Sequence, residues 1–157
     1  MNVCGWRIIL VNQYAGMSKA AEFITADAKE HPDSPKIVAW HEPRFSSGSG
    51  HGNDKSVQPL WAAAAAAGAR IVLNGHDHNY ERFAPRDASG DLSDTGTRQF
   101  VSGLGGHEVR VIGDVRPKSE KRYTGTPAVL FLTLKEDGAY SWALRAADGT
   151  VPDAGSA

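Results

Sequence analysis

Ile71-Val-Leu-Asn-Gly-His-Asp-His-Asn-Tyr-Glu-Arg82 is the stretch of sequence that decides how the rest of the chain is interpreted. Its first three residues are apolar and rich in β-branched side chains, which is typical of a buried strand. The pair Asn74-Gly75 ends that strand, and His76 and His78 follow at once. Imidazole is the commonest metal ligand in proteins. The stretch therefore predicts either a strand that presents two metal ligands in a sharp loop or two solvated loop histidines.

Alternating strands and helices are expected before this stretch. Residues 6–12 and 36–40 are short apolar runs typical of buried strands. A helix capped by Ser18 is expected over about 19–31, and a second helix over 57–67 is indicated by six consecutive alanines. With residues 71–73 the order is β-α-β-α-β, which predicts an α/β layer of neighbouring parallel strands.

The second half of the sequence has a different character. Residues 98–102 look like a strand, whereas residues 108–122 are polar and match no element. Residues 128–135 and 140–145 flank Glu136-Asp-Gly138, which predicts an antiparallel hairpin. We expect one domain portion over residues 1–147 and a flexible tail over residues 148–157, because the tail is small and polar.

The composition narrows the function classes. The length of 157 residues suits one domain, and the net charge of -1 shows no signal for nucleic acid or an anionic membrane. The sequence has no apolar run long enough to span a membrane and no recognisable secretory signal, so we leave the localisation open. Cys4 is the only cysteine, so any metal is expected to have nitrogen and oxygen ligands.

A third histidine is expected to join the two in the opening stretch. His41 follows the predicted strand over 36–40, and ligands of α/β sheets bind beside the carboxyl ends of strands. The alternative is that His41 only packs beside Trp40. The long Gly/Ser-rich loop that follows carries Arg44 and His51. Arg44 is suited to binding an anionic oxygen or to a structural ion pair, and His51 to proton transfer, phosphoryl contact or a solvated position.

Several motifs in this order resemble a known family. Val38-Ala-Trp-His-Glu-Pro-Arg-Phe-Ser-Ser-Gly48, His51-Gly52, Leu60-Trp61 and Asn74-Gly-His-Asp-His-Asn-Tyr-Glu-Arg-Phe-Ala-Pro85 resemble the C-terminal half of the calcineurin-like metallophosphoesterases, nearest the purple acid phosphatase-like branch. Residues 98–106 resemble the segment that follows in bacterial members. The resemblance implies half of a four-layer α/β/β/α sandwich, with a mixed sheet and a C-terminal β-hairpin.

The resemblance also implies a phosphoester hydrolase, a phosphatase or phosphodiesterase, that uses a metal-activated hydroxide. The family's cofactor is a dinuclear centre of Fe, Zn or Mn. His41, His76 and His78 match metal ligands, with His76 and His78 serving different ions. His51 resembles the catalytic histidine that contacts phosphate or protonates the leaving group, and Arg44 is expected to bind the substrate as well. Relatives are often exported.

The sequence departs from the family pattern at the carboxylate ligands. We find no Asp-x-His, no Gly-Asn-His, and only Gly90-Asp91 and Gly113-Asp114 after the histidine loop, where the family has its Gly-Asp motif before it. Two metal ions repel each other unless anions bridge them, so we expect this chain alone to bind one ion weakly, with little catalysis.

The alternative is an inactive fragment that pairs with a partner, or with itself, through an exposed sheet. A β-lactamase-like hydrolase would need His-x-His-x-Asp-His, but Tyr80-Glu81 occupy the last two positions.

Overall fold

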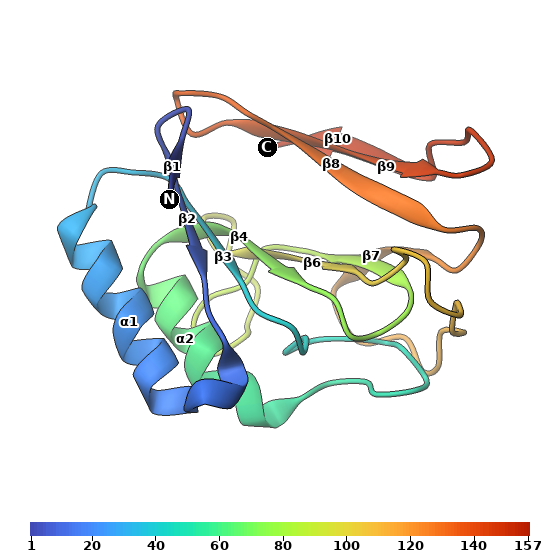
Figure 1. Cartoon of the computed structure of the whole chain (residues 1–157), viewed down its shortest axis with the longest axis horizontal. Helices are drawn as coiled ribbons and strands as arrows, with labels where there is room; N and C mark the ends of the chain where they lie inside the picture. The colour runs from blue at the N-terminus through green and yellow to red at the C-terminus, as the bar shows by residue number, and fades with distance from the viewer.

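The computed structural model describes residues 1–157 and consists of two β-sheets with two α-helices on one side (Figure 1). The larger sheet has seven strands in the order β1-β2-β3-β4-β6-β5-β7. Strands β2, β3, β4 and β6 are mutually parallel, and the other pairings are antiparallel. In chain order the seven strands are Asn2–Val3, Trp6–Leu10, Lys36–Ala39, Ala69–Asn74, Tyr80–Phe83, Arg98–Ser102 and Ser119–Tyr123. The predicted α/β class and the parallel β-α-β-α-β order are confirmed.

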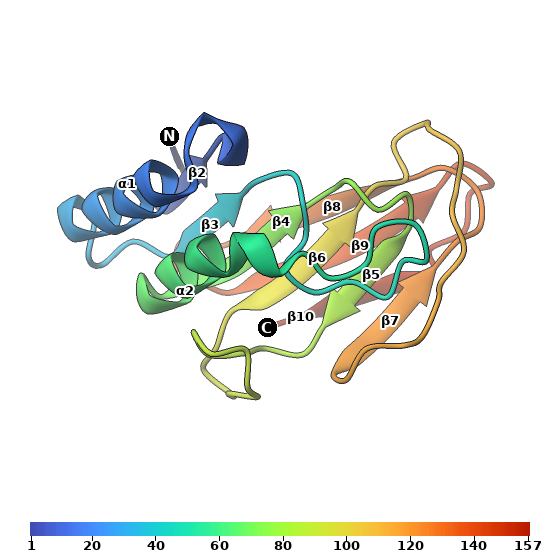
Figure 2. The same ribbon diagram turned by 90° about the horizontal axis from the view of Figure 1, so that it is seen from below.

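The helices α1 (Met17–Glu30) and α2 (Gln58–Ala66) lie over the β2–β3–β4 side of the larger sheet (Figure 2). Their inward side chains share one apolar core with the strands, and Ile24, Leu60 and Trp61 have no exposed surface. The predicted Ser18 cap is wrong, because α1 begins at Met17 after Gly16 and has no side-chain cap. Neither helix is long and apolar enough to cross a membrane.

A three-stranded antiparallel sheet covers part of the opposite face, in the order β10-β9-β8. Strands β8 (Ala128–Leu134) and β9 (Tyr140–Ala146) form the predicted hairpin. In place of the flexible tail expected over 148–157, residues Asp153–Ser156 form strand β10, which pairs with β9. Alternate residues of β9 are buried, and Trp142 packs against Phe100 of β6.

One buried carboxylate joins the two sheets. Oδ2 of Asp153 in β10 accepts hydrogen bonds from Tyr80 Oη at 2.6 Å, Arg82 Nε at 2.8 Å and Trp142 Nε1 at 3.0 Å. Tyr80 and Arg82 belong to β5 of the larger sheet. Since Asp153 is only 7% exposed, its charge is compensated almost entirely by these partners.

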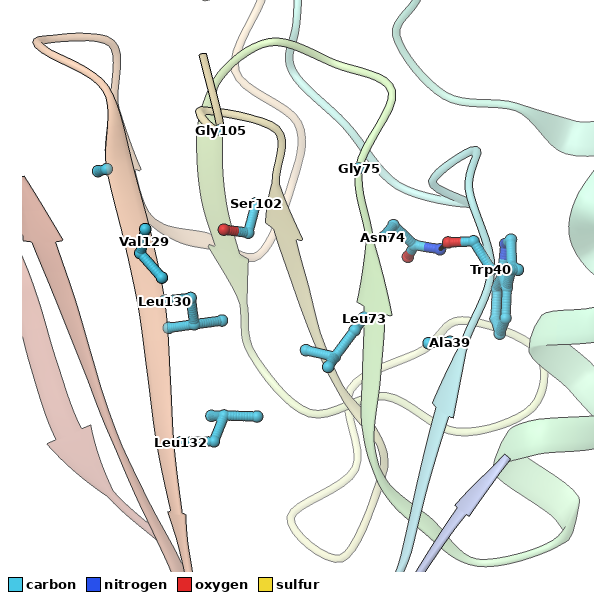
Figure 3. Close-up of a pocket in the computed structure, with 11 residues that line it drawn as sticks. Ala39, Trp40, Leu73, Asn74, Gly75, Ser102, Gly105, Val129, Leu130 and Leu132 are labelled. Carbon is cyan, nitrogen blue, oxygen red and sulfur yellow. Dashed lines mark hydrogen bonds between the residues drawn. The ribbon is translucent and has the colours of Figure 1, made fainter. Parts of the chain in front are cut away.

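Away from that junction the two sheets leave a cleft between them. A cavity of about 430 Å³ opens beside β3, β4 and β8 and is lined mainly by apolar side chains. Figure 3 shows Leu73 of β4 on one side and Leu130 and Leu132 of β8 on the other. Strand β8 pairs only with β9, so its other edge is free.

Candidate functional site

The candidate site forms where two parallel strands end side by side. Strand β3 ends at Ala39 and is in register with Leu73 of β4, so the loops that follow them start together. Gly75 N donates a hydrogen bond to His41 O at 3.0 Å. His41 Nε2 and His76 Nδ1 lie 3.1 Å apart. The structure thus brings together two of the three histidines that the sequence predicted to converge.

A tight turn presents His76. Its φ of 63° lies in the left-handed region, which non-glycine residues seldom adopt and which often marks functional sites. Gly103, after β6, supports the turn from behind, because a Cβ there would lie 1.9 Å from Asp77 O. Gly103 N also donates to Asn79 O at 2.9 Å. This glycine therefore allows the close approach of two backbone segments that fixes the histidine turn.

His51 comes from the long Gly/Ser-rich loop and completes a group of three touching imidazoles. Its ring centroid lies 3.9 Å from that of His76. Its Nε2 is hydrogen-bonded to Nη1 of Arg110. A guanidinium only donates, so Nε2 of His51 is the acceptor in this hydrogen bond and Nδ1 is left as the donor of the ring.

The surroundings of His76 favour its neutral form. Partial burial lowers the pKa of His76, and the neighbouring His51 and His41 lower it further, against an opposing effect from Glu42. The net pKa lies below the ordinary value of histidine. Neutral imidazole is the form that binds metal ions, so this environment favours a ligand role at neutral pH.

His78 lies apart from this group. Its Nδ1 donates to Glu108 O at 2.9 Å, and its ring stacks on His107, with the centroids 4.2 Å apart. Glu108 belongs to residues 108–122, which the sequence could not assign, and His107 directly precedes them. No contact joins His78 to His41, so its role as a ligand of a second ion stays a prediction.

Arg44 contacts none of the site histidines. Its Nε donates to Gln58 Oε1 in α2, and its guanidinium lies over the Phe45 ring at 4.7 Å. Burial lowers the pKa of Arg44, and no carboxylate forms an ion pair with it. The arginine that contacts a site histidine is Arg110, which sequence reasoning missed because its segment has no periodic pattern.

The nearby carboxylates have other partners. Glu42 Oε1 lies 4.0 Å from His76 Nε2, but Tyr14 and Gln13 donate hydrogen bonds to this carboxylate. Asp77 is buried, and its Oδ2 accepts from Ser46. Three buried oxygens beside the histidine turn have no hydrogen-bond partner, and they are Asn74 Oδ1, Asp77 Oδ1 and Asn79 Oδ1.

These donors suit one metal ion better than two. Two nitrogens that bind the same tetrahedral zinc ion are about 3.3 Å apart, close to the separation between His41 and His76. No group of three or more His, Cys, Asp or Glu side chains lies in position to hold a metal ion. Since no free carboxylate is placed to bridge two cations, the residues of this chain do not fit a dinuclear centre by themselves.

Comparison with known proteins identifies solved structures of similar fold. No family model and no curated protein matches the sequence. The structure is similar to that of the purple acid phosphatase PPD1 from yellow lupin (Lupinus luteus) seeds, with a TM-score of 0.76 and 18% identity over 99% of this chain. It is also similar to that of GAP50, the anchor in the inner membrane complex of Plasmodium, with a TM-score of 0.73 and 16% identity over 94% of this chain.

The two matched proteins are much longer than this chain. It spans 31% of the phosphatase and 47% of GAP50. At these identities the similarity concerns the fold, and it agrees with the resemblance that the histidine motifs indicated. The chain has the fold of part of the lupin purple acid phosphatase.

Proposed function

We propose that this chain contributes the histidine side of a metal-dependent phosphoester hydrolase. The observation that carries the proposal is the 3.1 Å separation of His41 Nε2 and His76 Nδ1 at the ends of two parallel strands. These two imidazoles would bind one divalent ion, and His51 would face the phosphate group. The parallel with the lupin phosphatase supports the reaction class through the fold alone.

Each residue has a role that follows from its surroundings. His41 and His76 bring one ring nitrogen each together from adjoining loops, and Gly103 holds the turn that orients His76. His51 carries its proton on Nδ1, from which it can donate to a phosphate oxygen or a leaving oxygen. A bound metal ion would supply an acidic water molecule near neutral pH. The bridging carboxylates of a dinuclear centre would have to come from chain beyond these 157 residues or from a partner.

The test is a calorimetric titration of the metal-free protein with zinc and, in a separate run, with manganese. We expect one ion to bind. His41→Ala and His76→Ala should each weaken its affinity at least about tenfold, because each removes one of two ligands. His31→Ala is the matched control, since His31 follows α1 and precedes β3, whereas His41 follows the other end of β3, and it should leave the affinity unchanged. Equal affinity in His76→Ala and the wild type would refute the ligand assignment.

A second candidate is a non-catalytic binding protein. It is favoured by the lack of any three-ligand group, and GAP50, which shares the fold, is described as an anchor. The free edge of β8, with Val129 and Phe131 about half exposed, would then serve a partner or self-association. Hydrolysis of a simple phosphomonoester by the metal-loaded chain, abolished in His76→Ala, would exclude this candidate. Metal binding without turnover would favour it.

A further inference from the structure

A second cavity lies between the two helices, which run side by side over one face of the larger sheet (Figure 2). Its volume is about 360 Å³, within the range of small-ligand sites. Lys36, the first residue of β3, belongs to its lining, whereas His41 follows the other end of that strand. The cavity therefore lies at the opposite end of the sheet from the candidate metal site.

Short side chains on α2 leave this space open. Ala63, Ala66 and Ala67, from the run of six alanines, form the α2 side of the cavity. Ala64 belongs instead to the apolar core and has no exposed surface. Alanine is the strongest helix former, but its one methyl group fills little of the space between two helices. The alanine run thus gives a regular helix with an unfilled side towards α1.

Lys36 is a buried cation without a counter-ion. It is only 3% exposed, and its Nζ donates to two backbone oxygens, Ser34 O at 2.9 Å and Pro32 O at 3.3 Å. No carboxylate forms an ion pair with it. An ammonium group has three N–H donors, so one of them has no acceptor in the protein. Buried lysines are rare unless they are paired, because removing a charge from water is costly.

Two acidic residues influence Lys36 without neutralising it. Burial lowers the pKa of Lys36, and Asp27 and Asp33 oppose this effect only in part. The carboxylate of Asp27 already accepts hydrogen bonds from Arg7 Nε, at 3.0 and 2.8 Å. Asp33 is exposed and lines a neighbouring cavity, not this one. The positive charge of Lys36 is therefore not compensated by the protein.

The charged residues of the lining are both basic. Lys29, in the last turn of α1, is the second of them, and no acidic residue lines the cavity. The carboxyl ends of the two helices oppose an anion through their dipoles. Lys29 offsets this effect at α1, and some of the terminal carbonyl groups already accept hydrogen bonds, from His31 N to Ala28 O and from Gly68 N to Ala65 O. Positive charge thus prevails in the cavity.

We propose that this cavity binds a small organic monocarboxylate, whose carboxylate group pairs with Lys36 and Lys29 and whose short apolar body contacts the alanines of α2. The carboxylate supplies the counter-ion that Lys36 lacks. The methyl groups of the lining suit an apolar body and not a strongly hydrated anion such as sulfate. The site is separate from the phosphoester chemistry proposed above and does not depend on it.

The experiment is calorimetric titration of the metal-free full chain with hexanoate, benzoate, hexanol and sulfate in separate runs. We expect saturable binding of a carboxylate, at least about tenfold tighter than the binding of hexanol or sulfate. Tighter binding of hexanoate would identify an aliphatic ligand, and tighter binding of benzoate an aromatic one. Absence of saturation with both carboxylates at millimolar concentration, or equal affinity for hexanoate and hexanol, would overturn the proposal.

Variants with matched controls test the named residues. Lys36→Met removes the charge at similar side-chain length and should weaken binding at least about tenfold. Ala63→Leu should also weaken binding, because it fills the cavity, and it tests the site independently if Lys36→Met does not fold. Lys55→Met and Ala26→Leu are the controls, since both residues are exposed and lie outside the lining. Urea denaturation verifies that each variant is folded. Wild-type affinity in Lys36→Met or in Ala63→Leu would overturn the proposal, whereas a failure of metal binding at the histidines would leave it intact.

Discussion

Asp153, at the junction of the two sheets, is fully hydrogen-bonded, whereas several buried polar atoms at the edge that carries the histidines have no hydrogen-bond partner. At the junction, Asp153 Oδ2 accepts three hydrogen bonds, from Tyr80, Arg82 and Trp142. At the histidine edge, both polar side-chain atoms of Asn79 are buried without a partner, and so are single oxygens of Asn74 and Asp77. The junction has one exception, because Arg98 Nε is also buried without a partner where its guanidinium lies over Trp142.

This difference indicates which region serves stability and which serves function. Most buried polar groups in folded proteins are hydrogen-bonded, so each exception needs a reason. Exceptions to the rules of stable folding are expected at functional sites, where a ligand or water supplies the missing partner. The junction thus holds the sheets together, whereas the histidine edge has polar atoms that are available to a ligand or to water. Three substitutions and one change of pH test this difference between the two regions.

The largest effect should come from Asp153→Asn at the junction. The change removes a buried negative charge and replaces one carboxylate oxygen with an NH2 donor, so Arg82, Tyr80 and Trp142 keep at most one neutral acceptor. We expect a loss of about 3–5 kcal/mol in the free energy of unfolding, measured by urea denaturation. Asp148→Asn is the matched control, because Asp148 is exposed and bonded only to Thr150, and it should cost below about 1 kcal/mol.

The pH dependence of the free energy of unfolding should also show the role of Asp153 at the junction. Burial would raise the pKa of Asp153, but hydrogen bonds from Arg82 and Tyr80 outweigh it and hold this pKa below its usual value. A lowered carboxyl pKa stabilises the fold above about pH 4, and this stability disappears as the pH falls through the lowered value. The unfolding free energy should therefore fall steeply below about pH 4 in the wild type. An equally steep fall in Asp153→Asn would contradict the assignment.

An intermediate effect is expected for Gly103→Ala, behind the histidine turn. The new Cβ would lie 1.9 Å from Asp77 O, so the backbone of the turn must shift. We expect a loss of about 1–3 kcal/mol in stability and weaker metal binding by His76. Gly105→Ala is the matched control, because nothing lies within 4 Å of its Cβ, and it should be close to neutral. Unchanged metal affinity in Gly103→Ala would show that the turn does not orient His76.

The smallest effect is expected for Asn79→Leu. Since neither polar atom of Asn79 has a partner in the protein, an apolar side chain should change the unfolding free energy by less than about 1 kcal/mol. Asn53→Leu should cost more, because Asn53 Oδ1 accepts a hydrogen bond from Ser46 N at 2.7 Å. Thermal unfolding of both variants checks this order. A larger loss for Asn79→Leu would reveal an ordered partner at that site and remove the contrast drawn above.

Much of the fold and part of the site were predictable from local pattern. The apolar runs ending at Ala39 and Leu73, separated by helices, predicted parallel neighbours whose carboxyl ends meet. The meeting of His41 and His76 follows from that order alone. The turn signal Glu136-Asp-Gly138 between two apolar runs likewise predicted the antiparallel hairpin of β8 and β9. These features depend on short-range periodicity, which a sequence displays directly.

Only the tertiary structure decided the features that join distant polar segments. The contact between His51 and Arg110 spans 59 positions, and the turn of His78 toward Glu108 spans 30. Residues 148–157 looked like a polar tail, yet Asp153 anchors β10 because Tyr80 and Arg82 are folded into reach. Polar loops have no periodic pattern, and their partners are set by how the packed sheets bring chain ends together. The sequence thus determined the three neighbouring parallel strands β2, β3 and β4 and one histidine pair, whereas packing decided which other imidazoles, guanidiniums and carboxylates meet.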